Sequence, residues 1–269
     1  MLIGIVAGAM GWGIFLPAMV QSQDYHRFAD TRTLLAIGNA ADTLSNAVFL
    51  LVGALGLAFL WRERAAGGTQ RFGSPQETWP YWVFFAGVAL TSVGSAYYHL
   101  VPDDARLVWD RLPMTVAFMS LLAAVIAERL SVRAGNLLLV PLVVLGVASV
   151  IYWRESALAG MENLRPYIAV QFGSIAVILT IALMYRSRYT RGAVIFAVAA
   201  AYAVAKALEV FDREVFELGH WASGHTLKHL AAAAGIFLLL RSLQVRSPRA
   251  AAPLGRRAPA ATPFGVASR

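Results

Sequence analysis

Two histidines open the last long apolar stretch of the chain, in the sequence SGHTLKHLAAAAGIF at residues 223–237. His225 and His229 are four residues apart, a spacing that places both imidazoles on one face of an α-helix. Two imidazoles in that position can bind one metal ion. Taken alone, the spacing also fits two histidines at a membrane surface or the two axial ligands of a haem. It therefore indicates a metal site without establishing one.

A third histidine, His99, ends an apolar stretch that closes in GSAYYHLVPDD. The order of the apolar stretches places His99 at the same side of a membrane as His225 and His229. Three neutral imidazoles leave a fourth tetrahedral position for water, which is the ligand set of a catalytic zinc site. Zinc lowers the pKa of its bound water toward ~7, so hydroxide becomes available at neutral pH. The other two histidines, His26 and His220, fall in polar connections, where we expect a structural role.

Two side chains near the histidines extend this site. Ser95 lies one helical turn before His99 on the same face, and Asp110, in RLVWDRLPMT, is expected at the outer start of the next apolar stretch. An aspartate there can orient a ligand histidine or take a proton from water, and a serine hydroxyl can donate a hydrogen bond to an oxyanion. Separately, Asp110 fits a helix N-terminal charge ahead of Pro113, and Ser95 fits a small packing residue. Together with the histidines, they favour catalysis.

The elements that must position these residues are membrane helices. The chain is 58% hydrophobic and 14% charged, with a mean hydropathy of +0.61, which excludes an ordinary soluble domain. Apolar runs of about 20 residues, enough to cross a ~30 Å hydrocarbon core, recur along its length. We mark eight of them, at residues 2–20, 43–61, 80–100, 113–128, 136–153, 166–185, 191–209 and 222–241. The sequence therefore predicts an all-α fold, a polytopic transmembrane helical bundle.

The expected organisation has three parts. Residues 1–22 would form an extra N-terminal transmembrane helix, residues 23–242 a seven-helix membrane domain, and residues 243–269 a disordered basic tail in the cytoplasm. The first stretch could instead be a signal peptide, but it lacks a basic start and a clear small-residue cleavage site, which favours a retained helix. Pro113 and Pro166 are expected in the first turns of their helices. The absence of cysteine excludes disulfides and thiolate metal ligands.

The distribution of arginine predicts the orientation in the membrane. With eight helices, both termini and the connections near 62–79, 129–135 and 186–191 share one side, which carries 14 arginines, whereas the opposite connections carry seven. The positive-inside rule places the arginine-rich side in the cytoplasm. The histidines then face the outer side. The alanine- and arginine-rich composition suggests a bacterial source, hence an inner membrane and a periplasmic site. The net charge of +8 reflects this asymmetry and not nucleic-acid binding.

Three further charged residues lie within the apolar stretches. Lys206 and Glu209, three residues apart near the outer end of the seventh stretch, can pair and extend toward the membrane interface. Lys228 lies between His225 and His229 in the sequence. We expect it to line the bundle near the interface or to contact a lipid headgroup.

Taken together, the segments GSAYYH, WD and SGHTLKH, with DTLSNAVFLLVG at residues 42–53, resemble the alkaline ceramidase family. That family belongs to a membrane superfamily that includes the progestin and adiponectin receptors. The resemblance implies a seven-helix core and a zinc ion on His99, His225 and His229, with Ser95 and Asp110 beside it. It also implies hydrolysis of the amide of ceramide, or of a related lipid amide from the bilayer, to a fatty acid and a sphingoid-type amine.

Two features of the family leave questions open. Animal members bind calcium in the loop before the first core helix, where this chain offers Asp24, Asp30, Asn39 and Asp42 as candidate ligands. Their pattern differs from that of the family, which places a calcium site in doubt. The superfamily also contains receptors, so the main alternative is a receptor or sensor of the same fold with a structural zinc. A haem-binding or transport protein would need more acids within the membrane.

Overall fold

The protein is described by a computed structural model that covers residues 17–67 and 71–249. In this part of the chain the fold is all-helical, with no strand. Six segments are helical, long and apolar enough to cross a membrane: Ala40–Ala65, Pro75–Leu100, Asp104–Arg129, Val132–Leu158, Arg165–Met184 and Gly224–Val245. The prediction of an all-α membrane protein is therefore confirmed.

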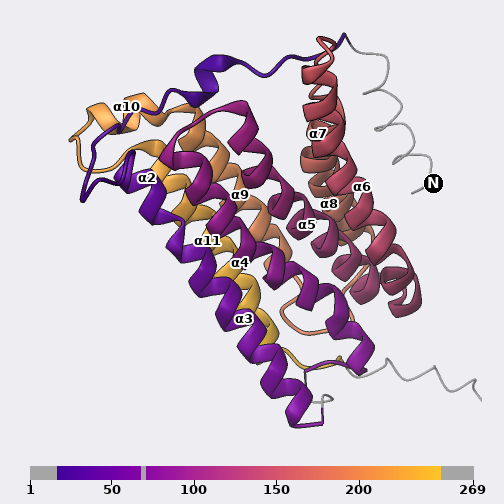
Figure 1. The fold of residues 1–269 in the computed structure, drawn as a ribbon. Coiled ribbons are helices and arrows are strands. Elements are labelled where there is room, and N and C mark those ends of the chain that lie inside the picture. Colours follow the sequence, from indigo (N-terminus) through magenta and orange to yellow (C-terminus); the bar gives the residue numbers. More distant parts are fainter. Residues whose placement is uncertain (1–16, 68–70, 250–269) are drawn as a thin grey trace, which may run out of the picture.

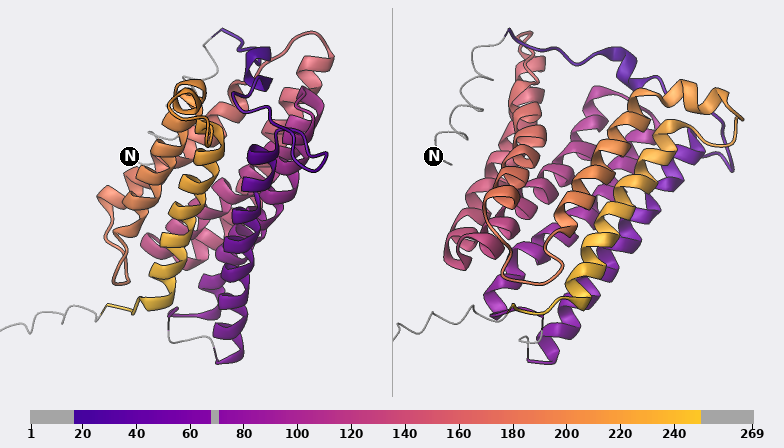
Figure 2. Two further views of the ribbon diagram at one scale, coloured as in Figure 1. Left: turned by 90° about the vertical axis from the view of Figure 1, so that its left-hand side faces the viewer. Right: turned by 180° about the vertical axis from the view of Figure 1, so that it is seen from behind.

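Figure 1 shows how these segments divide into elements. In chain order they are η1 (Gln23–His26), α2 (Ala40–Ser45), α3 (Ala47–Ala65), η2 (Pro75–Thr78), α4 (Trp79–Leu100), α5 (Asp104–Arg129), α6 (Val132–Leu158), α7 (Arg165–Ile168), η3 (Ala169–Gly173), α8 (Ser174–Met184), α9 (Val194–Val210), α10 (Asp212–Glu217) and α11 (Gly224–Val245). The helix α9 has 17 residues and packs along α11, as Figure 2 shows from behind. The main apolar core joins side chains of α3, α4, α5, α8, α9 and α11.

The N-terminal prediction is only partly covered by the structure. The helix expected at residues 2–20 lies outside the described residues up to position 16. Residues 17–22 are described and are irregular, so the predicted helix does not continue over 17–20. The extra N-terminal helix stays a prediction.

The helix α5 is longer at its start than the sequence predicted. It begins at Asp104, and the Asp103 carboxylate caps it by accepting a hydrogen bond from the backbone N–H of Arg106 at 2.7 Å. The added turns have the sequence DARLVWD. They are helical, but they are too polar to form part of an apolar run. Pro113 therefore lies inside the helix, not in its first turn as predicted, and Asp110 lies about two turns from its start.

The interior proline allows α4 and α5 to approach closely beside the predicted site. Pro113 has no N–H to donate to the carbonyl of Trp109, four residues earlier. That carbonyl faces Gly94 of α4, where an added Cβ would lie 2.0 Å from the Trp109 oxygen. Glycine is therefore required at this contact. The residues that follow Gly94 and Trp109 are Ser95 and Asp110, so the close contact brings these two predicted site residues together.

One end of the bundle is covered by the segment at residues 17–39, which is irregular apart from η1 and is drawn in indigo at the top of Figure 1. Its backbone is joined to the turn before α7 by a hydrogen bond from Leu164 N–H to Met19 O at 2.8 Å. Further along, Ala29 N–H donates to the carboxylate of Asp212 in α10 at 2.9 Å. The segment thus closes the end at which α4 finishes and α5 and α11 begin.

The opposite end of the bundle corrects the predicted C-terminal boundary. The disordered tail was expected from residue 243, but α11 continues to Val245 and the next residues are packed. Arg246 is 3% exposed, and its Nη1 lies 2.8 Å from Glu128 Oε2. The backbone N–H of Thr190 donates to Ser247 O at 2.9 Å. Residues 250–269 of the predicted tail lie outside the described part of the chain.

Candidate metal centre

Three histidines converge at the covered end of the bundle. The Nε2 atom of His99 lies 3.3 Å from Nε2 of His225 and 3.4 Å from Nε2 of His229. The three candidate ligand nitrogens all lie within 4.8 Å of one another. The side chains are buried, with exposed fractions of 1%, 4% and 4%. The structure therefore brings together the three residues that the sequence predicted to share a metal site.

The spacing of these imidazoles fits a tetrahedral metal ion. With Zn–N bonds of about 2.0–2.1 Å, two ligand nitrogens of a tetrahedron are about 3.3–3.4 Å apart, which matches both distances from His99. The imidazoles do not fully satisfy one another, because Nε2 of His99 carries at most one proton for its two contacts and Nδ1 of His99 is buried without a hydrogen-bond partner. A metal ion at the centre would satisfy all three nitrogens. The donor set therefore suits such an ion.

Ser45 fixes the orientation of His229. The Ser45 hydroxyl donates to the backbone oxygen of Asp42 at 2.9 Å, so its oxygen is free to accept the hydrogen bond from Nδ1 of His229 at 2.7 Å. This places the His229 proton on Nδ1 and directs the lone pair of Nε2 toward His99. Metal-binding histidines are commonly held by a second hydrogen bond of this kind. The sequence did not predict Ser45 as a site residue.

The short helix α2 joins the two histidine-bearing helices. Asp42 is fully buried, and its Oδ1 accepts hydrogen bonds from Ser223 Oγ at 2.9 Å and from Thr226 Oγ1 at 2.6 Å, at the start of α11. Asn39, just before α2, donates from Nδ2 to the backbone oxygen of His99 at 2.8 Å. The only sequence signal for these contacts is the DTLSN segment, whose resemblance to the family assigned no roles to its side chains.

The start of α11 is also fixed from the side of α9 and α10. The Asp212 carboxylate accepts a hydrogen bond from the backbone N–H of His225 at 2.7 Å. At Gly224 an added Cβ would lie 2.1 Å from the backbone oxygen of Leu208, so this position also requires glycine. The ring of Phe28, from the covering segment, packs on His225 at a centroid distance of 4.5 Å. His225 is therefore held by three separate elements.

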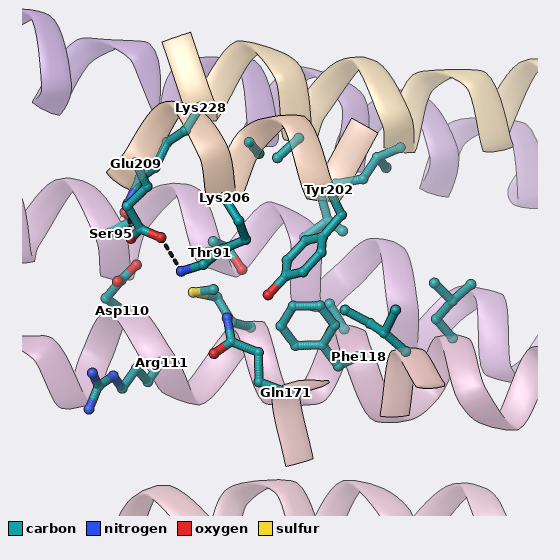
Figure 3. A pocket seen from close by; sticks show the side chains of 18 of the residues that line it. Thr91, Ser95, Asp110, Arg111, Phe118, Gln171, Tyr202, Lys206, Glu209 and Lys228 are labelled. Atoms are coloured by element: carbon teal, nitrogen blue, oxygen red, sulfur yellow. Dashed lines mark hydrogen bonds and ion pairs between the residues drawn. The ribbon is translucent and has the colours of Figure 1, made fainter. Parts of the chain in front are cut away.

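A cavity of about 330 Å³ opens beside the histidines. Figure 3 shows that it runs between the helices with polar side chains at one end. There, Ser95 Oγ lies 3.2 Å from His99 Nε2, and Asp110 faces Ser95. The rest of the lining is mainly apolar, including Phe84, Val88, Met114, Phe118, Leu121, Ile178, Ile195, Val198 and Ile236. Of the five predicted site residues, Ser95, Asp110 and His229 line this cavity. His99 and His225 lie next to it, since Nε2 of His99 is within 3.4 Å of Nε2 of both other histidines.

A second polar group lines the same end of the cavity. Glu209 Oε1 lies 2.8 Å from Lys228 Nζ and accepts a hydrogen bond from Tyr25 OH at 2.9 Å. Its Oε2 atom pairs with Lys206, the interaction drawn as a dashed line in Figure 3. The expected Lys206–Glu209 pair is therefore present, but it faces the cavity together with Lys228.

The four candidate calcium ligands have separate protein partners. Asp24 pairs with Arg27 at 2.9 Å on the surface, and Asp30 pairs with Arg32 at 2.6 Å. The Arg32 guanidinium, which hydrogen bonds the Asp30 carboxylate, holds the pKa of that carboxyl below its usual range. Asn39 and Asp42 make the contacts to α4 and α11 described above. These partners do not test calcium binding, which stays a doubtful prediction.

Comparison with protein families places these features in context. A family model described as Ceramidase matches residues 33–243, which include the three histidines, Ser95 and Asp110. The chain belongs to the ceramidase family. The resemblance predicted from the sequence is therefore confirmed, and ceramidase-family membership supports lipid amide hydrolase activity in a membrane protein. Comparisons with curated proteins and with solved structures gave no match.

Proposed function

We propose that this ceramidase-family protein is a zinc-dependent amidohydrolase. It cleaves the amide of ceramide or of a related membrane lipid, and releases a fatty acid and a sphingoid-type amine. The observation that carries the proposal is a cluster of three buried histidines, one of which, His229, lines the polar end of a mainly apolar cavity together with Ser95 and Asp110. The apolar lining suits an acyl chain, and in this proposal the amide carbonyl lies at the polar end beside His229, Ser95 and Asp110.

Each residue of the site has a role in this reaction. His99, His225 and His229 would hold the zinc ion, which when bound supplies Lewis-acid polarisation and activation of water. Asp110 takes the proton of the attacking water and returns a proton to the leaving nitrogen, as the new C–O bond forms and the C–N bond breaks. Ser95 Oγ donates a hydrogen bond to the developing oxyanion, a contact worth ~3 kcal/mol when correctly placed.

We also propose how the helices are arranged and oriented in the membrane. The helix α9, packed along α11, completes a seven-helix core with the six apolar segments, within the predicted domain at residues 23–242. The extra helix of this proposal ends before residue 17, because residues 17–22 are irregular, and its basic tail begins after α11 and the packed residues that follow it. The arginine distribution supports termini in the cytoplasm of a bacterium and a site near the periplasmic face of the inner membrane. The lipid reaches the cavity from the bilayer.

Metal removal tests the proposed function. Protein purified in detergent should contain about one zinc ion per chain and should release fatty acid from at least one member of a panel of ceramides and simpler lipid amides. A chelator should abolish this release, and added zinc should restore it. Metal-free protein that retains full activity would contradict the proposal. A zinc-containing protein that cleaves none of the amides would instead favour the receptor or sensor alternative.

Removing the hydrogen bond to His229 should weaken the metal site. In Ser45→Ala we expect the affinity for zinc to fall by about 10- to 100-fold, because Nδ1 of His229 loses the partner that fixes its proton and its orientation. Competition with a chromogenic chelator measures the affinity. Ser149→Ala is the matched control, since Ser149 is a buried serine on α6 that bonds only its own helix backbone. An affinity unchanged in Ser45→Ala would show that this hydrogen bond does not support the metal.

A further inference from the structure

Arg111 is a buried cation within a cage of aromatic rings. It follows Asp110 in α5, is 4% exposed and lines the cavity. Its guanidinium carbon lies 4.3, 4.5 and 5.8 Å from the ring centroids of Trp153, Tyr167 and Tyr25. Figure 3 shows that Arg111 extends away from the side of the helix on which Asp110 faces Ser95. The neighbouring carboxylate acts on Arg111 electrostatically but forms no salt bridge with it.

In the part of the chain that the structure describes, Arg111 has no salt-bridge partner. Nη2 donates a hydrogen bond to the neutral side-chain oxygen of Gln21, whereas Nη1 is buried and has no hydrogen-bond partner. Among the residues that the structure describes, no carboxylate lies within 4.0 Å of the guanidinium nitrogens. A buried charge is costly unless an opposite charge compensates it. The cage therefore leaves a place for an anion.

A second arginine of the same chain shows what completes such a cage. Arg246, at the opposite end of the bundle, lies 3.9, 4.4 and 5.6 Å from the ring centroids of Tyr189, Phe72 and Tyr81. It is buried to the same degree, but it also pairs with the carboxylate of Glu128 at 2.8 Å. Each of the two cages thus consists of three aromatic rings around a buried guanidinium. The cage on α5 lacks the carboxylate.

The cavity as a whole carries an excess of positive charge. Lys206 and Lys228 share the single carboxylate of Glu209. With Arg111 and Asp110, the lining contains three cationic and two acidic side chains. A zinc ion at the histidines would increase this excess. The polar end of the cavity therefore suits an anionic ligand better than a neutral one.

We propose that Arg111 binds an anionic group, such as a carboxylate, on the amine half of the lipid amide. This assignment rests on the proposed amidohydrolase function and names its substrate class. Asp110 and Arg111 are consecutive residues that line the same cavity, so one lipid can place its amide at Asp110 and an anionic group of its amine half at Arg111. N-acyl amino acids have this arrangement. Gln21, which the anion would replace, belongs to the irregular covering segment and not to a membrane helix.

Two lipids that differ only in charge test this inference. N-palmitoylglycine and N-palmitoylethanolamine share their acyl chain, but the first carries a carboxylate where the second carries a hydroxymethyl group. We expect the protein to prefer N-palmitoylglycine in kcat/KM. Arg111→Met should lower kcat/KM for this lipid by about 10- to 100-fold and leave the neutral lipid little changed. Arg106→Met is the control, since Arg106 lies on the same helix, pairs with Asp103 and does not line the cavity.

Binding of the same two lipids, and of the possible product palmitate, to chelator-treated protein, measured by calorimetry, gives a readout that does not need turnover. A loss of N-palmitoylglycine affinity in Arg111→Met supports the anion site even if no amide is cleaved, in which case the proposed function alone fails. Unchanged affinity and preference would overturn the inference while leaving the amidase intact. A loss confined to palmitate would also overturn it, since the anion would then be the fatty-acid product. Arg111→Lys keeps the charge but not the planar guanidinium, so its affinity for N-palmitoylglycine should lie between those of the unaltered protein and Arg111→Met. This variant replaces Arg111→Met in the test if Arg111→Met does not fold.

Discussion

Replacing His225 with alanine should remove the bound metal and, with it, the release of fatty acid from lipid amides. His225 contributes one of three buried nitrogens, and its Nε2 lies 3.3 Å from that of His99. The two remaining imidazoles cannot form the three-ligand site of a catalytic zinc ion. We expect the loss of zinc affinity to exceed the ~10- to 100-fold typical of removing a hydrogen-bond partner of a ligand. Metal content per chain and fatty-acid release measure the two effects.

The control for this experiment is His220→Ala. His220 is exposed and lies in the loop before α11, five residues from His225, so its loss should change neither metal content nor activity. Thermal unfolding of both variants shows whether the fold survives. If His225→Ala retained one metal ion per chain and full amidase activity, the metal would have to bind elsewhere, and the proposed site would be wrong.

The convergence of the histidines could be predicted because it depends on few facts. The i, i+4 spacing puts His225 and His229 on one helix face, and the order of apolar stretches puts the end of α4 and the start of α11 at the same end of the bundle. Both facts follow from helical periodicity and from the length needed to cross a membrane. Helical periodicity and the length of a membrane span do not predict the distances of 3.3 and 3.4 Å between the imidazole nitrogens.

The supporting contacts could not be predicted in this way. Ser45 and His229 are 184 residues apart in the chain, and nothing in the local sequence of α2 indicates which polar side chain faces a histidine. Arg111 lies just before the apolar run at residues 113–128, so the sequence predicts it in an outer connection. It is instead buried, because α5 begins at Asp104 with polar turns that an apolar-run criterion misses. Polar helical turns and contacts between distant segments are the features that hydropathy does not encode.

Changing Asp110 to asparagine should separate catalysis from metal binding. Asparagine has nearly the same shape, and its side chain can still contact Ser95, but it cannot take a proton from the attacking water. We expect kcat to fall by about 100- to 10,000-fold, the usual contribution of a general base, while zinc content stays at the level of the unaltered protein. Steady-state release of fatty acid, with metal analysis of the same sample, measures both quantities.

The pH dependence of this variant distinguishes a base from a merely structural aspartate. If Asp110 accepts the proton, kcat of the unaltered protein should rise with pH as the carboxyl ionises, and this rise should disappear in Asp110→Asn. Asp103→Asn is the matched control on the same helix, because asparagine caps a helix as well as aspartate does and Asp103 lies outside the cavity. A loss of zinc together with activity would instead assign Asp110 to holding the metal site. An unchanged kcat would remove it from the mechanism. Only a low kcat with full zinc content and a flattened profile agrees with proton transfer at this carboxylate.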